Sequence, residues 1–145
     1  MFLAALLLQA APHCAATDAS LPAPLAGWRT PGGAFDIGKA VTLQAGDVAT
    51  LAGVPAGAKP GGAAMIAFRV ATAGRHGVAL DQGGWIDVLP GAAGGEALKS
   101  TAHGPGPQCS TIRKIVRFDL RPGVYRVYLT GLKSPSAKVM LVAPE

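Results

Sequence analysis

The strongest constraint on the fold is a pair of alternating segments in the last third of the chain. Residues 111–120 and 124–132 each alternate apolar with polar side chains, which is the period of a half-buried β-strand. Between them, Pro122 pre-sets the first central φ of a tight turn and Gly123 accepts a positive φ. Because so short a turn joins antiparallel strands, this hairpin predicts an antiparallel β protein.

Seven further segments carry strand signals and are separated by glycine- and proline-rich turns. In residues 64–71, for example, Ile66, Phe68 and Val70 share one face. The others are residues 39–43, 47–51, 75–80, 85–89, 96–101 and 137–142, of which the first two flank a predicted hairpin turn at Ala45 and Gly46. Eight or nine short strands without a long helix predict a single all-β domain, an antiparallel β-sandwich or jelly roll.

The N-terminal segment has the character of a secretion signal. Residues 1–11 are apolar apart from Gln9, and this run is too short to span a bilayer but matches a signal-peptide core. Small residues at Ala16 and Ala19 provide cleavage sites, although no basic residue precedes Arg29. We therefore expect a signal peptide over about residues 1–19, an irregular lead-in over 20–38 and the β-sandwich over 39–145. The mature protein is expected to be periplasmic or secreted, with no stable membrane span.

The chemical state expected for the two cysteines, Cys14 and Cys109, depends on where the signal peptide is cleaved. Cleavage before Cys14 would bring both into an oxidising compartment, where a disulfide between them is expected. Cleavage after Ala16 would leave Cys109 as a lone thiol. Lipid attachment to Cys14 is a third alternative, but Pro12 and His13 fit a lipidation motif poorly.

The charge of the chain argues against nucleic-acid binding. The net charge is +5, yet the lysines and arginines are scattered rather than clustered. Aromatic residues are few and lie at strand spacing, where core packing accounts for them. A diffuse positive field of this kind helps solubility and favours acidic surfaces in general.

Several polar residues stand out as candidates for ligand binding. If the strand of Trp85 lies beside that of Ile112, Asp87 and Arg113 would face each other as a cross-strand pair. With Trp85, they would line a shallow anionic or sugar site; the alternative is a surface ion pair of little consequence. Trp28 and Trp85 are better explained as packing residues than as platforms for sugar stacking. The candidate ligand-binding residues are Trp85, Asp87, His103, Arg113 and Lys114.

A metal site is the alternative hypothesis for the loop over residues 102–110. His103 and Cys109 carry the imidazole and thiolate ligands that suit copper, and a third ligand would come from His76, Met65 or Met140. A copper- or iron-binding protein, or an oxygenase, would then use this loop. The other interpretation is a structural loop anchored by a disulfide.

Enzymatic motifs are missing from the sequence. There is no G-x-S-x-G nucleophile elbow, and the eight acidic residues show no arrangement typical of glycoside hydrolysis. The function predicted from the residues is thus that of an exported, non-catalytic module. Its partner would be a small ligand, an envelope polymer or a protein, with no cofactor required.

Short motifs resemble two groups of bacterial proteins. The hairpin around Pro122 and Gly123, with the preceding strands over residues 64–143, resembles jelly-roll accessory modules of secreted enzymes. Residues 85–88, 103–109 and 112–114 resemble small exported bacterial proteins of unassigned function, some of which are labelled homogentisate 1,2-dioxygenase. That enzyme is a longer cupin-type protein whose iron is held by two histidines and a glutamate. The histidines and glutamates of this chain show no such spacing: His13, His76, His103, Glu96 and Glu145.

Overall fold

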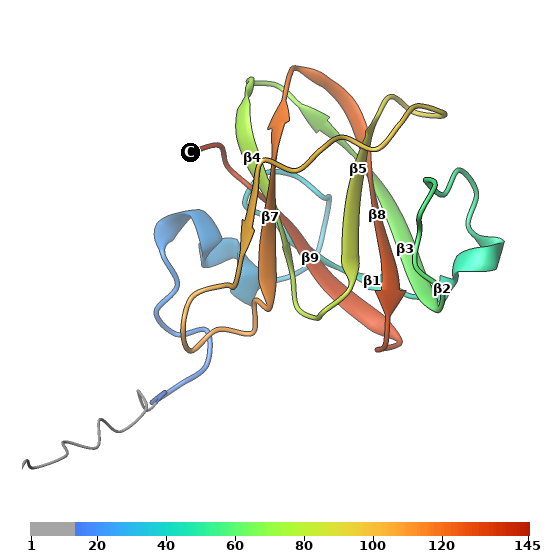
Figure 1. Ribbon diagram of the computed structural model, residues 1–145. Coiled ribbons are helices and arrows are strands. Elements are labelled where there is room, and N and C mark those ends of the chain that lie inside the picture. The colour runs from blue at the N-terminus through green and yellow to red at the C-terminus, as the bar shows by residue number, and fades with distance from the viewer. Residues whose placement is uncertain (1–13) are drawn as a thin grey trace, which may run out of the picture.

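Two antiparallel sheets pack face to face in the computed structural model, which describes residues 14–145 (Figure 1). One sheet has the strand order β1-β9-β4-β7-β6 and the other β2-β3-β8-β5. In chain order the nine strands of the described residues are β1 (Ala40–Gln44), β2 (Gly46–Asp47), β3 (Gly62–Val70), β4 (Gly74–Leu80), β5 (Trp85–Pro90), β6 (Ala102–Gly104), β7 (Lys114–Leu120), β8 (Gly123–Leu132) and β9 (Ser136–Val142). The predicted all-β sandwich is confirmed, and the chain changes sheet at most connections, as in a jelly roll.

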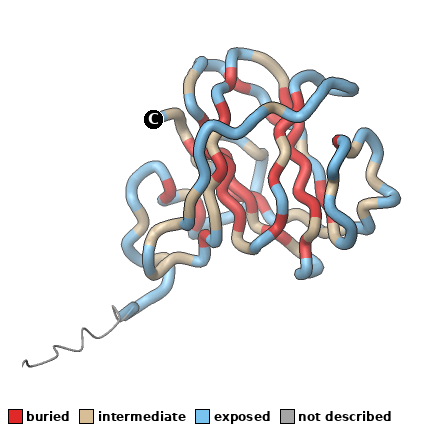
Figure 2. The backbone as a smooth tube through the Cα atoms, viewed as in Figure 1, coloured by how far each residue is buried: buried red, intermediate tan, exposed pale blue. Residues whose placement is uncertain are grey.

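The main core lies between the two sheets and is built by alternation along each strand. Val78 of β4 and Phe118 of β7 face Val127 and Leu129 of β8, and all four are buried. Figure 2 shows these buried segments at the centre of the strands, with exposed residues concentrated in the connections. The predicted turn between β7 and β8 is closed by Tyr125, whose hydroxyl donates to the carbonyl oxygen of Arg121 at 2.8 Å.

The lead-in over residues 20–38 contains a short 3-10 helix, η1 (Ala23–Arg29), that covers the outer face of the five-stranded sheet. Leu25 and Trp28 pack there against Ala79 and Met140, and Trp28 is fully buried. Its indole Nε1 donates to the hydroxyl of Thr111 at 2.9 Å. Trp28 is therefore a packing residue, as predicted, and its buried ring offers no surface for a sugar.

Three predicted elements differ from the structure. The strand expected over residues 47–51 is wrong beyond Asp47, because the next residues form a short 3-10 helix, η2 (Val48–Thr50). The hairpin expected at Ala45 and Gly46 is wrong, because β1 pairs with β9 and β2 pairs with β3 in the other sheet. Local alternation cannot distinguish a hairpin turn from a crossover between sheets. The strand expected over residues 96–101 is also wrong: the edge strand β6 lies later, inside the predicted loop, where it pairs with β7.

Two long connections cover the outer face of the four-stranded sheet. The buried Arg126 side chain donates to the carbonyl oxygens of Pro90, Gly91 and Gly94, which begin the connection from β5 to β6. The hydroxyl of Tyr128 donates to the carbonyl oxygen of Ala52 at 3.0 Å, in the connection before β3. Since charge-assisted hydrogen bonds to carbonyls are strong, Arg126 fixes the path of the β5–β6 connection. In Figure 1 this connection crosses the molecule toward the strand beside β7.

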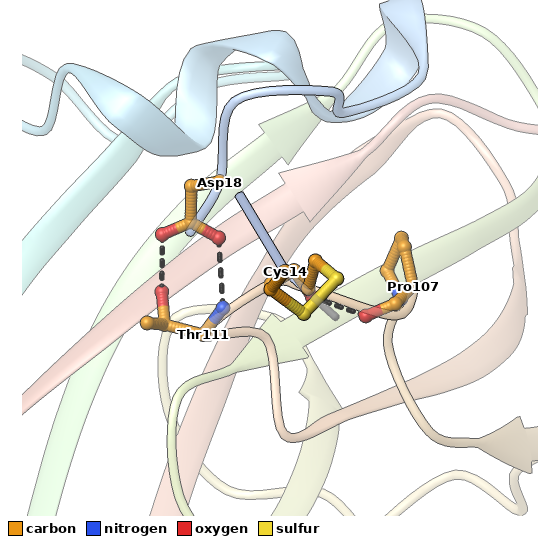
Figure 3. Close-up of a disulfide and its surroundings, with 6 residues drawn as sticks. Cys14, Asp18, Pro107 and Thr111 are labelled. Carbon is orange, nitrogen blue, oxygen red and sulfur yellow. Dashed lines mark hydrogen bonds between the residues drawn. A yellow bond between two sulfur atoms is a disulfide. The ribbon is translucent and has the colours of Figure 1, made fainter. Parts of the chain in front are cut away.

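A disulfide joins Cys14 to Cys109, with the two Cα atoms 5.4 Å apart (Figure 3). Beside it, Asp18 accepts hydrogen bonds from the backbone N–H of Thr111 at 2.7 Å and from its hydroxyl at 2.6 Å. The predicted disulfide is confirmed, and Cys109 is not a lone thiol. Most of the expected signal peptide, residues 1–13, lies outside the described residues. Within residues 14–145 no helix has the length and apolar character to cross a membrane.

Candidate functional site

A cleft of about 550 Å³ opens between the edges of the two sheets. One wall belongs to β5 and the other to β6 and β7, so the cleft lies where the edge strands of the sandwich diverge. Ile86 and Val116 are buried and form its apolar floor. The lining residues are Trp85, Ile86, Ser100, His103, Gly104, Pro105, Arg113, Lys114 and Val116. Four of the five candidate ligand-binding residues are thus brought together, and the lining contains no carboxylate.

Pairing between β6 and β7 explains why His103 lies at the cleft. His103 pairs with Val116, and paired residues of antiparallel strands point to the same face of the sheet. Since Val116 faces the space between the sheets, so does His103, but it lies at the open edge and is exposed. Gly106 follows against Ile112, where there is no room for a side chain, and the disulfide then fixes Cys109. The wall that carries His103 is therefore anchored on its C-terminal side.

Trp85 projects at the start of β5 with half of its surface (50%) exposed. Its indole Nε1 donates to the carboxylate of Asp87 at 3.3 Å, which fixes the orientation of the ring. Two ammonium groups lie over the ring: Lys59 Nζ is 5.0 Å and Lys114 Nζ 5.9 Å from its centroid. Distances of up to about 6 Å to the ring centroid are those of cation–π contacts. The indole face is therefore flanked by two ammonium groups, while its N–H edge is held by the Asp87 carboxylate.

Lys114 crosses the cleft from β7 to the turn before β5. Its ammonium group donates to the carbonyl oxygen of Gly84 at 2.5 Å. Burial lowers the pKa of Lys114, because desolvation disfavours its charged form. Arg113 beside it is exposed, and its backbone N–H donates to the carbonyl oxygen of Leu80. The guanidinium is thus available to a ligand at the rim.

Asp87 does not line the cleft, and the conditional pairing with Arg113 does not form. β5 pairs with β8, so Asp87 lies opposite Tyr128 on the outer face of its sheet, whereas Arg113 precedes a strand of the other sheet. Burial raises the pKa of the Asp87 carboxyl, and the hydrogen bond from Trp85 and the charge of Lys59 oppose that rise. Asp87 therefore acts on the site by positioning Trp85.

The residues considered for a metal site do not meet. Cys109 is oxidised in the disulfide and offers no thiolate. His76 is fully buried in the core, where its Nδ1 faces the carbonyl oxygen of Gly74, whereas His103 is exposed at the sheet edge. Met140 packs under η1 on the outer face of the sheet. In residues 14–145 no three histidine, cysteine or acidic side chains are grouped as metal ligands.

Lys59 also belongs to this site, although the sequence did not predict its contact with Trp85. It belongs to a proline- and glycine-rich loop without periodicity, so nothing in the pattern placed it beside Trp85. The loop reaches the site because the backbone N–H of Lys59 donates to the hydroxyl of Thr130 at 3.1 Å. Thr130 pairs with Trp85 across β8 and β5, which brings Lys59 over the indole. Only this tertiary pairing reveals the contact.

Comparison with protein-family models, with curated proteins and with solved structures finds no match to this chain.

Proposed function

We propose that the protein is an exported, non-catalytic binding module whose cleft holds an acidic sugar unit of an envelope polymer. One observation carries the proposal: an exposed indole converges with His103, Arg113 and Lys114 on a single cleft that has no carboxylate in its lining. Its volume of about 550 Å³ falls in the range of small-molecule sites, about 300–1,000 Å³.

The charge around Trp85 favours an anionic ligand over a neutral one. The ammonium groups of Lys59 and Lys114 lie 5.0 Å and 5.9 Å from the indole centroid, where a neutral sugar would have to displace them in order to stack. A carboxylate would instead pair with the same cations and with the Arg113 guanidinium, which suits carboxylate geometry. An acidic ligand thus gains affinity from the same ammonium groups that a neutral sugar would have to displace.

The rest of the cleft suits the body of a sugar. Ile86 and Val116 provide an apolar floor for the C–H face of a pyranose ring. Ser100 and the backbone at Gly104 provide polar groups for its hydroxyls. Specific small-molecule sites combine an apolar surface with a few placed polar groups in this way.

Export is the second part of the proposal. Disulfides form and persist in oxidising compartments, which supports a periplasmic or secreted location for a chain stapled by Cys14 and Cys109. Because Cys14 and Asp18 are both bound to the loop before β7, we place signal cleavage ahead of Cys14 rather than near residue 19. The resemblance to accessory modules of secreted enzymes agrees with this assignment.

Calorimetric titration of the purified protein with digalacturonate and with its carboxyl-reduced, neutral counterpart tests the proposal. We expect the acidic disaccharide to bind more tightly, and Trp85→Ala to weaken that binding by about tenfold or more. Lys39→Ala, an exposed lysine ahead of β1, is the matched control and should bind normally. Equal affinity for the acidic and neutral sugars, or turnover of the sugar, would contradict the proposal.

A further inference from the structure

A second cleft of about 500 Å³ lies next to the first and also lacks a carboxylate in its lining. It is formed by the turn between β4 and β5 and the turn between β8 and β9, and its cations are Arg113 and Lys133. Arg113 lines both clefts. The hydrogen bond from Lys114 of the first cleft to the carbonyl oxygen of Gly84 in the second marks the boundary between them.

The second cleft is held in shape by Gln82. Its side-chain amide donates to the carbonyl oxygen of Ser136 at 2.9 Å, and its carbonyl oxygen accepts from the backbone N–H of Ser134 at 3.3 Å. These bonds tie the β8–β9 turn to the β4–β5 turn. On the same wall, a side chain at position 84 would press on the end of the Leu132 side chain and on the carbonyl oxygen of Thr130, so Gly84 allows close packing there. The cleft is thus braced by side chain and backbone together.

We propose that the two clefts are consecutive subsites joined by Arg113, so that the protein binds an acidic oligosaccharide carrying at least two negatively charged groups. One charged group lies among Arg113, Lys114 and Trp85, and a second lies between Arg113 and Lys133. This inference rests on the proposed function and names its ligand class more narrowly: a polyanionic glycan segment rather than a single acidic sugar.

The arrangement of charge supports a ligand that runs across the boundary. The cations of the two clefts come from separate elements, with Lys114 in β7 and Lys133 after β8. A single anionic group cannot contact both clefts fully, because the Lys114–Gly84 bridge separates them. Repeated charges along one ligand would engage both clefts. The second contact would form within the complex already held by the first, and it would therefore add affinity.

Calorimetry with galacturonate, which carries one carboxylate, and with tetragalacturonate tests the subsites. In the unaltered protein we expect tetragalacturonate to bind more tightly than galacturonate. Lys133→Ala should weaken tetragalacturonate binding by about fivefold and leave galacturonate binding unchanged. Arg113→Ala should weaken the binding of both. Lys133 and Arg113 are exposed, so neither change removes a buried contact, and Lys39→Ala is the control at the opposite end of the sheet.

The outcomes separate this inference from the proposed function. If Lys133→Ala leaves tetragalacturonate binding unchanged while Trp85→Ala still weakens it, the second subsite is wrong and the first cleft stands. If Trp85→Ala affects neither ligand, the proposed function itself is wrong. A hexaglutamate peptide that binds as tightly as tetragalacturonate, with the same loss in Lys133→Ala, would overturn the assignment to saccharides.

Discussion

Single residues of the cleft differ in how far the sequence predicts them. Trp85, His103, Arg113 and Lys114 stand out because such side chains are unusual beside strand or turn patterns, and the structure brings them to one cleft. Asp87 stands out for the same reason and shares a face of β5 with Trp85, but it lies two residues further along the strand and does not line the cleft. The wrong pairing with Arg113 came from an assumed strand neighbour, which residue type does not reveal.

Lys114 makes ligand binding sensitive to alkaline pH. Because burial lowers its pKa, Lys114 loses its proton at a lower pH than an ordinary lysine does, and the attraction for a carboxylate falls with it. Digalacturonate affinity should therefore begin to decline at a pH below the ordinary lysine pKa of about 10.4. Lys114→Arg should show a smaller decline, because a guanidinium stays protonated beyond about pH 12. Titrations at several pH values check this, and equal declines would assign the effect to other groups.

At the scale of elements, long alternating strands were predictable and short edge strands were not. β3, β7 and β8 each carry seven or more residues, and alternation over that length identifies the face directed to the core. β2 and β6 contain only two and three residues, which is too few for a period. They form because β3 and β7 offer them hydrogen-bonding partners. Their positions follow from tertiary pairing rather than from local pattern.

The disulfide stabilises the element that bears His103. Its two cysteines are 95 residues apart in sequence, for which the loss of chain entropy in the unfolded state corresponds to about 4.7 kcal/mol. The double variant Cys14→Ser, Cys109→Ser should lose a comparable free energy of unfolding, as measured by urea denaturation. Chemical reduction of the unaltered protein provides the control and should give the same loss. An unchanged free energy of unfolding in the double variant and in the reduced protein would show that the disulfide does not stabilise the fold.

At the scale of the whole molecule, the interleaved strand order explains where the site lies. Strands that alternate between two sheets leave β5 at one edge and β6 at the other, and the cleft forms where these edges diverge. The sandwich was predictable from the number and length of strands and from the frequent turns. The position of the cleft was not, because it depends on which strands end up as edges.

The segment that begins at Cys14 is joined to the domain by the disulfide and by hydrogen bonds of Asp18. Asp18 accepts two hydrogen bonds from Thr111, and its own N–H donates to the carbonyl oxygen of Cys109. Intact mass spectrometry of the purified mature protein, with and without a thiol-alkylating reagent, should show an N-terminus at or before Cys14 and no free thiol. A mature chain that begins after Asp18 and carries one reactive thiol would contradict the proposed cleavage.

Binding of an acidic sugar at the cleft beside Trp85 can be observed through the indole N–H signals in a ¹H–¹⁵N spectrum. The chain has two tryptophans: Trp28 is fully buried under η1, and Trp85 is half exposed at the cleft. Titration with digalacturonate should shift the Trp85 indole signal in a saturable way and leave that of Trp28 in place. A Trp85 signal that stays fixed while the ligand binds elsewhere, or does not bind at all, would contradict the account.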